Sequence, residues 1–318
     1  MQYELEELAN LADTAGAEVF GEITQRRIKA DAAFFIGKGK AESIVNQAKE
    51  LRCNIILFND ELSPTHVKNL QKLAGDDIKI LDRTGVILDI FSQHVKTKES
   101  RKQVELAKLE YMLPRLTRQW THLERQMGGI GTRGGPGETQ IEIDRRLIRN
   151  QITKLKSELE KISRQRSTQN QNRKNAYKVA LVGYTNAGKS TLLKALTGEN
   201  VYIQDQLFAT LDTTTRRLDL AKELPVLLSD TVGFIHKLPH NLVASFRSTL
   251  SEVNDADLLL KVVDCSSPHF KNHLDTISEV MTNITSRQID YILVFNKMDN
   301  LKDTTQLNKL KTNYPDAV

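Results

Sequence analysis

Short apolar runs alternate with helical stretches over residues 17–95. The runs AEVFGEITQ, NIILF and IKILD predict strands at residues 17–25, 54–58 and 78–82. The stretches between and after them predict helices at residues 40–51, 63–73 and 84–95. Ser63 and Asp82 stand where a side chain can cap the first exposed amides of a helix. Strands alternating with helices are typical of a small parallel α/β domain, which we place at residues 1–98.

From Leu106 onward the apolar residues lie alternately three and four apart, the spacing of a coiled-coil seam. This seam contains Leu106, Leu109, Leu113, Leu116, Trp120, Leu123 and Met127. Pro114 lies inside it and predicts a kink or a split, because proline removes one amide and clashes with the preceding turn. A second seam contains Ile148, Ile152, Leu155, Leu159 and Ile162. Together they predict an antiparallel helical hairpin and polar linker over residues 99–175.

A glycine-rich run separates the two seams. Residues 128–137 hold six of the sixteen glycines in the chain, and Gly129–Gly134 fits the pattern G-x-G-x-x-G. A dinucleotide-binding turn with that pattern must follow a strand, whereas this run follows a helical seam. We therefore interpret residues 128–137 as the tip loop of the hairpin. Small residues there would let the backbone and Arg133 approach a negatively charged surface, so Arg133, Gly134 and Gly135 are candidate RNA contacts; a merely flexible turn is the alternative.

The pattern of apolar and polar residues changes again from residue 176, where apolar runs are separated by long helical or loop segments. The runs YKVALVG, PVLLSD, DLLLKVVD and DYILVFNK predict four strands at residues 177–183, 225–230, 257–264 and 290–297. This spacing is typical of a doubly wound sheet, in which ligands bind at the carboxyl ends of the strands. We place this α/β domain at residues 176–318.

The first of these strands leads into a phosphate-binding loop. Residues 183–190 fit G-x-x-x-x-G-K-[ST] between a strand and a helix, which is the context that the motif requires. Backbone amides of such a loop hold the β-phosphate, Lys189 supplies positive charge to the phosphates, and the Ser190 hydroxyl ligates Mg²⁺. The predicted nucleotide-binding residues here are Gly183, Tyr184, Thr185, Asn186, Ala187, Gly188, Lys189, Ser190 and Thr191.

Two further motifs end later strands. The sequence Asp230-Thr231-Val232-Gly233 can hold magnesium through a water on Asp230, and it can bring the Gly233 amide to the γ-phosphate. The sequence Asn296-Lys297-Met298-Asp299 offers a carboxylate that accepts hydrogen bonds from N1–H and the exocyclic amine of guanine, which adenine cannot supply. The three motifs in this order indicate that the chain binds GTP.

Composition and charge narrow the cellular setting. The chain of 318 residues is 39% hydrophobic and 27% charged, values ordinary for a globular protein, and it contains no long apolar run or signal peptide. We expect a cytoplasmic monomer, with Cys53 and Cys265 as reduced core residues. The net charge is +5, but residues 99–174 hold 17 Lys and Arg against 9 Asp and Glu, so they carry +8 and the remainder −3. Such an excess suits nucleic acid, with a solvated charged helix as the alternative.

The loop after the phosphate-binding motif carries a more specific resemblance. The sequences Phe208-Ala209-Thr210-Leu211-Asp212 and Thr213–Arg217, the glycine run ending at Gln140, and the helix from Ser100 to Arg115 resemble the HflX family of GTPases. The resemblance implies that Phe208, Ala209, Thr210, Leu211 and Asp212 belong to the nucleotide-binding site, and that Thr210 joins Ser190 on Mg²⁺ and senses the γ-phosphate. It also implies GTP and GDP as ligands, slow GTP hydrolysis, contact of the first domain and hairpin with ribosomal RNA of the large subunit, and separation of ribosomal subunits.

Three features depart from the usual GTPase pattern. Phe234 stands where many GTPases carry a glutamine that orients the attacking water, so we expect hydrolysis to depend on a partner. No catalytic residue is certain. Asn186 resembles the asparagine by which some related GTPases hold K⁺, which makes potassium dependence a hypothesis. A GTPase domain of this fold is expected to continue for roughly 50 residues beyond Val318, with a last strand, a guanine-backing loop and a closing helix, so we expect the chain to be truncated.

Other functions fit the sequence less well. A GTP-dependent switch that acts through helix–helix contacts with a protein partner, without RNA, remains the principal alternative. An ATPase or kinase is disfavoured by Asp299. The pairs His236/His240 and His269/His273 have helical spacing but no third ligand, so we interpret them as surface or switch residues and not as a zinc site.

Overall fold

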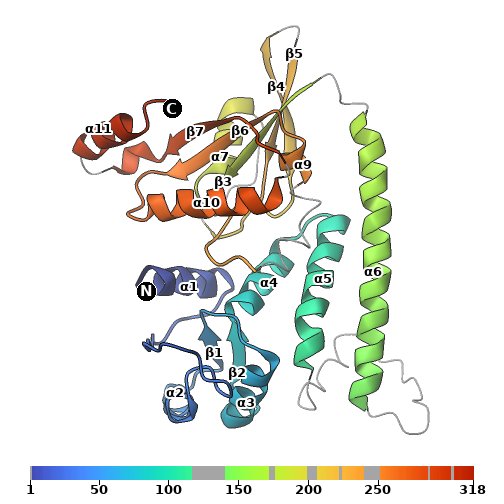
Figure 1. The fold of residues 1–318 in the computed structure, drawn as a ribbon, viewed down its shortest axis with the longest axis vertical. Coiled ribbons are helices and arrows are strands. Elements are labelled where there is room, and N and C mark those ends of the chain that lie inside the picture. The colour runs from blue at the N-terminus through green and yellow to red at the C-terminus, as the bar shows by residue number, and fades with distance from the viewer. Residues whose placement is uncertain are drawn as a thin grey trace. The chain divides into compact units, whose positions relative to one another are not determined.

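The computed structural model describes residues 2–116, 140–171, 176–198, 206–221, 224–239, 251–285, 287–301 and 304–318 (Figure 1). The chain forms two compact units. The first comprises Met1–Ile90 and Glu105–Glu158, and the second comprises Phe91–Val104 and Leu159–Val318. Within the described ranges, no helix combines the length and apolar character needed to cross a membrane.

The first unit contains the predicted small α/β fold. Its elements are α1 (Gln2–Thr14), α2 (Lys38–Glu50), β1 (Ile55–Phe58), α3 (Pro64–Ala74), β2 (Lys79–Asp82) and α4 (Arg83–His94), of which α4 ends in the second unit. Strands β1 and β2 pair in parallel from Ile55↔Lys79 to Phe58↔Asp82. Helices α2 and α3 pack on them around a core that includes Val45, Leu62, Leu70 and Ile80. Helix α1 was not predicted from the sequence.

The expected strand at residues 17–25 does not form. These residues are extended but pair with no strand among the described residues, and they are largely exposed. Val19, Phe20 and Ile23 have exposed fractions of 44%, 59% and 38%. Their alternation has the period of a strand, but a strand also needs a neighbour for its amides and carbonyls. The sequence-based prediction for this segment was therefore wrong.

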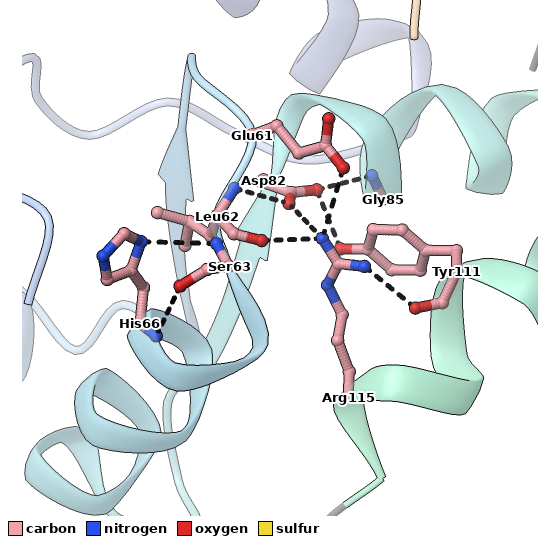
Figure 2. A network of polar contacts seen from close by, with 8 residues as sticks. All are labelled: Glu61, Leu62, Ser63, His66, Asp82, Gly85, Tyr111 and Arg115. Atoms are coloured by element: carbon pink, nitrogen blue, oxygen red, sulfur yellow. Dashed lines mark hydrogen bonds and ion pairs between the residues drawn. The ribbon is translucent and has the colours of Figure 1, made fainter. Parts of the chain in front are cut away.

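A buried polar network joins β2 to the carboxyl end of α5 (Lys98–Met112) and the 3₁₀ turn that follows it (Figure 2). Asp82 is fully buried and accepts hydrogen bonds from the amides of Leu62 and Gly85 at 3.0 Å each and from the Tyr111 hydroxyl at 2.7 Å. The Arg115 guanidinium lies 3.3 Å from the Asp82 carboxylate and donates to the Leu62 carbonyl at 2.7 Å. Burial, followed by the charge of Asp82, raises the pKa of Tyr111, which therefore stays a neutral donor.

Both predicted helix caps are present. Ser63 accepts a hydrogen bond from the His66 amide at 3.2 Å, and the His66 ring nitrogen Nδ1 accepts one from the Ser63 amide at 3.3 Å. Asp82 caps α4 through the Gly85 amide. These contacts show why the helices begin where the sequence predicted.

The hairpin arms are α5 (Lys98–Met112) and α6 (Gln140–Gln171), which run antiparallel. The Gln151 side chain on α6 donates a hydrogen bond to the Glu105 carboxylate on α5 at 2.6 Å, and the Arg145 guanidinium donates one to the Leu116 carbonyl at 3.4 Å. Pro114 ends α5, because residues Leu113–Arg115 form a 3₁₀ turn instead of continuing the helix. The helix is therefore interrupted at Pro114, where the sequence predicted a kink or a split. The first seam beyond Leu116 and the tip loop at residues 128–137 lie outside the described residues.

The second unit carries a five-stranded sheet in the order β4-β5-β3-β6-β7. The strands are β3 (Tyr177–Gly183), β4 (Thr214–Ala221), β5 (Leu224–Asp230), β6 (Leu258–Asp264) and β7 (Tyr291–Asn296), and β4 alone among them is antiparallel to its neighbour. Helix α7 (Lys189–Thr197) packs on β3–β5, and α10 (Phe270–Ile284) packs on β3 and β6. The short α9 (Ser251–Asn254) and α11 (Thr304–Asn313) complete the helices of this unit that the structure describes, apart from segments shared with the hairpin and α4. This arrangement confirms the predicted α/β P-loop fold.

The edge of β7 carries the last residue of the chain. Val318 donates its amide to the Leu293 carbonyl at 2.9 Å and accepts from the Phe295 amide at 2.8 Å. These two hydrogen bonds hold Val318 beside the edge of β7.

Candidate nucleotide-binding site

The phosphate-binding loop connects β3 to α7 at the carboxyl edge of the sheet. Asn186 and Gly188 both have left-handed backbone, with φ of 59° and 90°. A Cβ at Gly188 would lie 2.1 Å from Asn296 Nδ2, so only glycine fits at this position. The loop residues predicted from the sequence therefore form one turn whose shape depends on the guanine-reading motif.

Lys189 lies at the centre of this turn and is buried, with 6% exposure. Its Nζ donates to the carbonyls of Tyr184 at 2.8 Å and Gly183 at 3.2 Å. Burial lowers the pKa of Lys189 to about 8, although the nearby Asp230 carboxylate opposes this shift. In this structure the buried Lys189 ammonium group is hydrogen-bonded to backbone carbonyls. It is well placed to bind phosphate oxygens, because their negative charge would favour its protonated form.

Three oxygen-bearing side chains converge beside Lys189. The Ser190 hydroxyl lies 2.8 Å from the Thr210 hydroxyl and donates to the Asp230 carboxylate at 2.5 Å. Asp230 is fully buried, and its Oδ1 has no hydrogen-bond partner in the described part of the chain. Burial raises the pKa of Asp230, and Lys189 and the hydrogen bonds only partly offset this effect. Hydroxyl and carboxylate oxygens around an unsatisfied buried acceptor suit a hard divalent cation.

The guanine-reading motif follows β7 and is tied to the phosphate loop. Asn296 donates from Nδ2 to the Ala187 carbonyl at 2.9 Å. Lys297 has left-handed backbone, with φ of 59°, and its Nζ lies 3.0 Å from the Asp264 carboxylate. Met298 and Asp299 begin a 3₁₀ turn, and Asp299 is exposed. The Asp299 carboxylate is therefore open to a base held beside Lys297.

Phe234 does not point a usable group toward the phosphates. Its ring is buried, with 1% exposure, and its backbone pairs with the phosphate loop. Its amide donates to Gly183 at 3.0 Å and its carbonyl accepts from Thr185 at 2.7 Å. A Cβ on the preceding Gly233 would lie 2.5 Å from Thr185 Cα, so glycine is required for this close approach. The chain thus holds the motif residues Asp230–Gly233 firmly, but Phe234 supplies no group to orient water.

The loop that contains Thr210 is held on both sides. Phe208 is buried, donates its amide to the Thr185 hydroxyl at 2.8 Å, and packs edge-on against Phe91 with ring centroids 4.8 Å apart. Leu211 is buried next to Thr210. The Asp212 carboxylate, predicted as part of the nucleotide site, contacts the amides of Lys96 and Thr97. Ala209 and Thr210 are half-buried between these anchors.

Sequence reasoning missed Asp264, and its interpretation of His273 as a surface or switch residue was wrong, because His273 is buried on α10. The Asp264 carboxylate accepts hydrogen bonds from the Lys297 ammonium group and the Ser266 hydroxyl. Although burial acts to raise the pKa of Asp264, these hydrogen bonds hold it below its usual value. Asp264 ends an apolar strand, as Asp230 does, and that position was a usable signal. His273 stacks on Tyr184 with ring centroids 3.9 Å apart, and burial lowers its pKa to about 4. No local pattern links those two rings, because they are joined only by the fold.

The other candidate residues are those proposed for RNA contact and the histidine pairs. Arg133, Gly134, Gly135 and His240 lie outside the described residues. Among the residues that the structure describes, no group of three or more histidine, cysteine or carboxylate side chains is placed to hold a metal ion. The exposed side chains of α6 include Arg146, Arg149, Lys154, Lys156, Lys161 and Arg164. The positive charge predicted for the hairpin is therefore presented to solvent on this arm.

Comparisons with known proteins match this architecture in order along the chain. Residues 2–92 match the model "GTP-binding GTPase N-terminal", residues 94–173 match "GTP-binding GTPase Middle Region", and residues 178–297 match "50S ribosome-binding GTPase". GTPase HflX of Flavobacterium psychrophilum is 51% identical over 301 residues, which are 95% of this chain and 72% of that protein. The chain belongs to the HflX GTPase family. GTPase HflX of Escherichia coli is 45% identical over 318 residues, covering 99% of this chain and 74% of the relative.

A solved structure supports the same conclusion about the fold. The crystal structure of the SsGBP and GDP complex has a TM-score of 0.53 and 25% identity, covering 97% of this chain and 85% of that one. As an HflX GTPase with a complete phosphate-binding loop, the chain binds and hydrolyses GTP. The motif-based prediction of a GTPase is confirmed.

Proposed function

We propose that this HflX GTPase requires magnesium, binds the large ribosomal subunit in its GTP form and separates ribosomal subunits. The match of residues 178–297 to a model described as a 50S ribosome-binding GTPase carries the ribosomal part of this proposal. The convergence of Ser190, Thr210 and Asp230 beside Lys189 carries the nucleotide part. The two parts together describe a nucleotide-controlled ribosome factor.

Magnesium would be held by Ser190 and Thr210 directly and by Asp230 through water. The unsatisfied Oδ1 of Asp230 and the short Ser190 contacts fit this role. When bound there, the ion would neutralise charge that develops on the β- and γ-phosphate oxygens. The site requires Thr210, which lies on a loop, so the complete set of oxygens depends on the position of that loop.

The rest of the nucleotide site uses residues that the sequence already indicated. Backbone amides of residues 183–191 would hold the phosphates, and the Gly233 amide would face the γ-phosphate. Asn296, Lys297 and Asp299 would hold guanine, with Met298 and residues 208–212 contributing backbone. Because Phe234 is buried and apolar, hydrolysis would be slow until a ribosomal partner supplies a group that orients water.

The hairpin would bring this switch to ribosomal RNA. Residues 99–175 form the proposed middle domain, between an α/β domain at residues 1–98 and the GTPase domain at residues 176–318. Exposed basic side chains along α6 supply charge for phosphate contacts. Arg133, Gly134 and Gly135 at the tip would approach the RNA most closely. We expect the protein to act as a monomer in the cytoplasm.

Asn186 carries a separate proposal of potassium dependence. Its left-handed backbone, with φ of 59°, turns the loop beside the phosphate position. A monovalent cation there would add positive charge near the β- and γ-phosphates. GTP hydrolysis should then be faster in potassium than in sodium buffer, and Asn186→Ala should remove the difference. Equal wild-type rates in the two salts would contradict this proposal.

Subunit separation is tested by sucrose-gradient sedimentation of purified 70S ribosomes with protein and GTP. We expect conversion of 70S particles into subunits with the wild-type chain. A variant with Arg133→Glu, Gly134→Leu and Gly135→Leu should retain GTP binding and lose this activity, whereas Lys311→Glu on the exposed face of α11 serves as a charge-matched control. Intact 70S particles with every protein, or unchanged separation by the tip variant, would contradict the proposal.

A salt titration separates RNA contact from the alternative of a helix–helix protein interface. Affinity for RNA phosphates falls log-linearly with salt, because counterions are released on binding. An apolar helix–helix interface would show little dependence. A steep decline in ribosome affinity between low and high salt is therefore expected.

A further inference from the structure

We propose that Asp212 is a positioning residue for GTP hydrolysis: by holding the amino end of α5, its carboxylate fixes the 208–212 loop so that Thr210 completes the cation site. The inference rests on the proposed magnesium site. Asp212 lies only two residues from Thr210, yet its side chain turns away from Ser190 and Asp230 toward the segment between α4 and α5. That segment, residues 95–97, belongs to the same compact unit.

The contacts of Asp212 are numerous for a half-buried loop carboxylate. One oxygen accepts from the Lys96 amide at 2.8 Å and the Thr97 amide at 3.2 Å, and the other accepts from the Thr97 hydroxyl at 2.6 Å. A carboxylate is a charged acceptor, and charged acceptors make the stronger hydrogen bonds.

The partner segment is itself well ordered by local chemistry. The Thr97 hydroxyl accepts from the Ser100 amide at 3.1 Å, which is the geometry of a helix cap at the start of α5. A carboxylate at a helix amino terminus is further stabilised by the positive end of the helix dipole. Glu99, Ser100 and Gln103 in the first turns of α5 are buried. Asp212 thus binds to the capped amino end of a helix whose first turns are buried.

The opposite end of the loop is held by a second contact with α4. Phe208 packs edge-on against Phe91, and its amide donates to Thr185 in the phosphate loop. Thr210 therefore lies between two anchors, Phe208 and Asp212, and its hydroxyl is placed 2.8 Å from Ser190. Loss of the Asp212 anchor should free Thr210 to move, because only Leu211 separates the two residues in the chain. Helices α4 and α5 also supply residues to the first unit, so the anchors connect the switch loop to elements outside the GTPase sheet.

The test compares wild type, Asp212→Asn, Thr97→Val, Thr97→Ser and the control Asp275→Asn, which changes an exposed carboxylate on α10. We expect Asp212→Asn and Thr97→Val to lower kcat about tenfold and to raise the magnesium concentration for half-maximal rate, in line with loss of hydrogen bonds to a charged group. GDP affinity in EDTA should stay within about twofold of wild type, since the phosphate and guanine contacts do not change. Thr97→Ser keeps the hydroxyl and should restore both parameters.

A second readout does not depend on activity. In hydrogen–deuterium exchange without nucleotide or metal, the amides of Lys96 and Thr97 should exchange faster in Asp212→Asn than in wild type. Wild-type kcat, magnesium dependence and amide exchange in both variants would overturn the inference, as would a proportional loss of GDP affinity in EDTA. If the rate of GTP hydrolysis by the wild type did not depend on magnesium concentration, that result would instead overturn the magnesium site on which the inference rests.

Discussion

Asn296 donates a hydrogen bond of 2.9 Å from its Nδ2 to the carbonyl of Ala187, and this bond ties the guanine-reading motif to the phosphate-binding loop. The same Nδ2 would lie 2.1 Å from a Cβ at Gly188. Base recognition and phosphate recognition are therefore parts of one packed structure. A substitution in either motif should therefore change the conformation of the other.

Asn296→Ala should weaken GDP binding about tenfold or more, because it removes a donor to the phosphate loop and leaves a part-buried carbonyl unsatisfied. The measurement is equilibrium binding of a fluorescent GDP. The control is Asn272→Ala, an exposed asparagine on α10. An unchanged dissociation constant for Asn296→Ala would show that the bond does not support the loop.

Asp299→Asn should exchange guanine specificity for xanthine. The carboxylate accepts from N1–H and the exocyclic amine of guanine, whereas an amide can donate to the oxygen that xanthine carries in place of that amine. We expect GTP affinity to fall at least about 100-fold and xanthosine triphosphate affinity to rise. Competition binding with the two nucleotides measures the switch, and retention of GTP preference would refute the assigned role.

Stability should fall in mild acid because of His273. Its folded pKa of about 4 lies below the unfolded value, so the unfolded chain binds more protons between about pH 6.5 and 4 and is favoured as the pH falls. The loss contributed by this group should be roughly 1–2 kcal/mol at pH 5. His273→Phe keeps a ring against Tyr184 but does not titrate. Thermal unfolding from pH 7 to pH 5 should therefore show a smaller decline for this variant; equal declines would rule out His273 as the cause.

Arg115→Met should destabilise the first unit by about 3–5 kcal/mol, since it leaves Asp82 buried without its cation. The double variant Asp82→Asn, Arg115→Met should recover part of this loss, because the buried carboxylate that lost its cation is also removed. Urea unfolding followed by circular dichroism gives the free energies, with the exposed Arg149→Met as control. GDP affinity should not change. A loss no larger than that of Arg149→Met would mean that the network contributes little.

The nucleotide motifs were predictable because each is a contiguous pattern at the end of an apolar strand. Lys189, Asp230 and Asn296 all lie where the sequence indicated, at the carboxyl edge of one sheet. Helices α2, α3 and α4, both helix caps and the interruption at Pro114 followed from local chemistry in the same way, whereas α1 was not predicted. The segment at residues 17–25 did not, because alternation alone supplies no partner strand.

Contacts between distant segments were beyond reach of the sequence. Nothing around Asp212 indicates that its carboxylate meets Thr97, which is 115 positions away. The same holds for the stacking of Tyr184 on His273 and the pairing of Lys297 with Asp264. Such pairs arise from packing, and a single sequence carries no periodic signal for them.

The most direct test of the proposed function is co-sedimentation of the protein with purified 50S subunits at a fixed moderate salt concentration. A nonhydrolysable GTP analogue, GDP and no nucleotide are compared, with Asp299→Asn as the control that cannot read GTP. We predict at least about tenfold tighter binding with the GTP analogue than with GDP, and no such difference for Asp299→Asn. Equal binding of the wild-type chain in all three conditions would contradict a GTP-controlled ribosome factor.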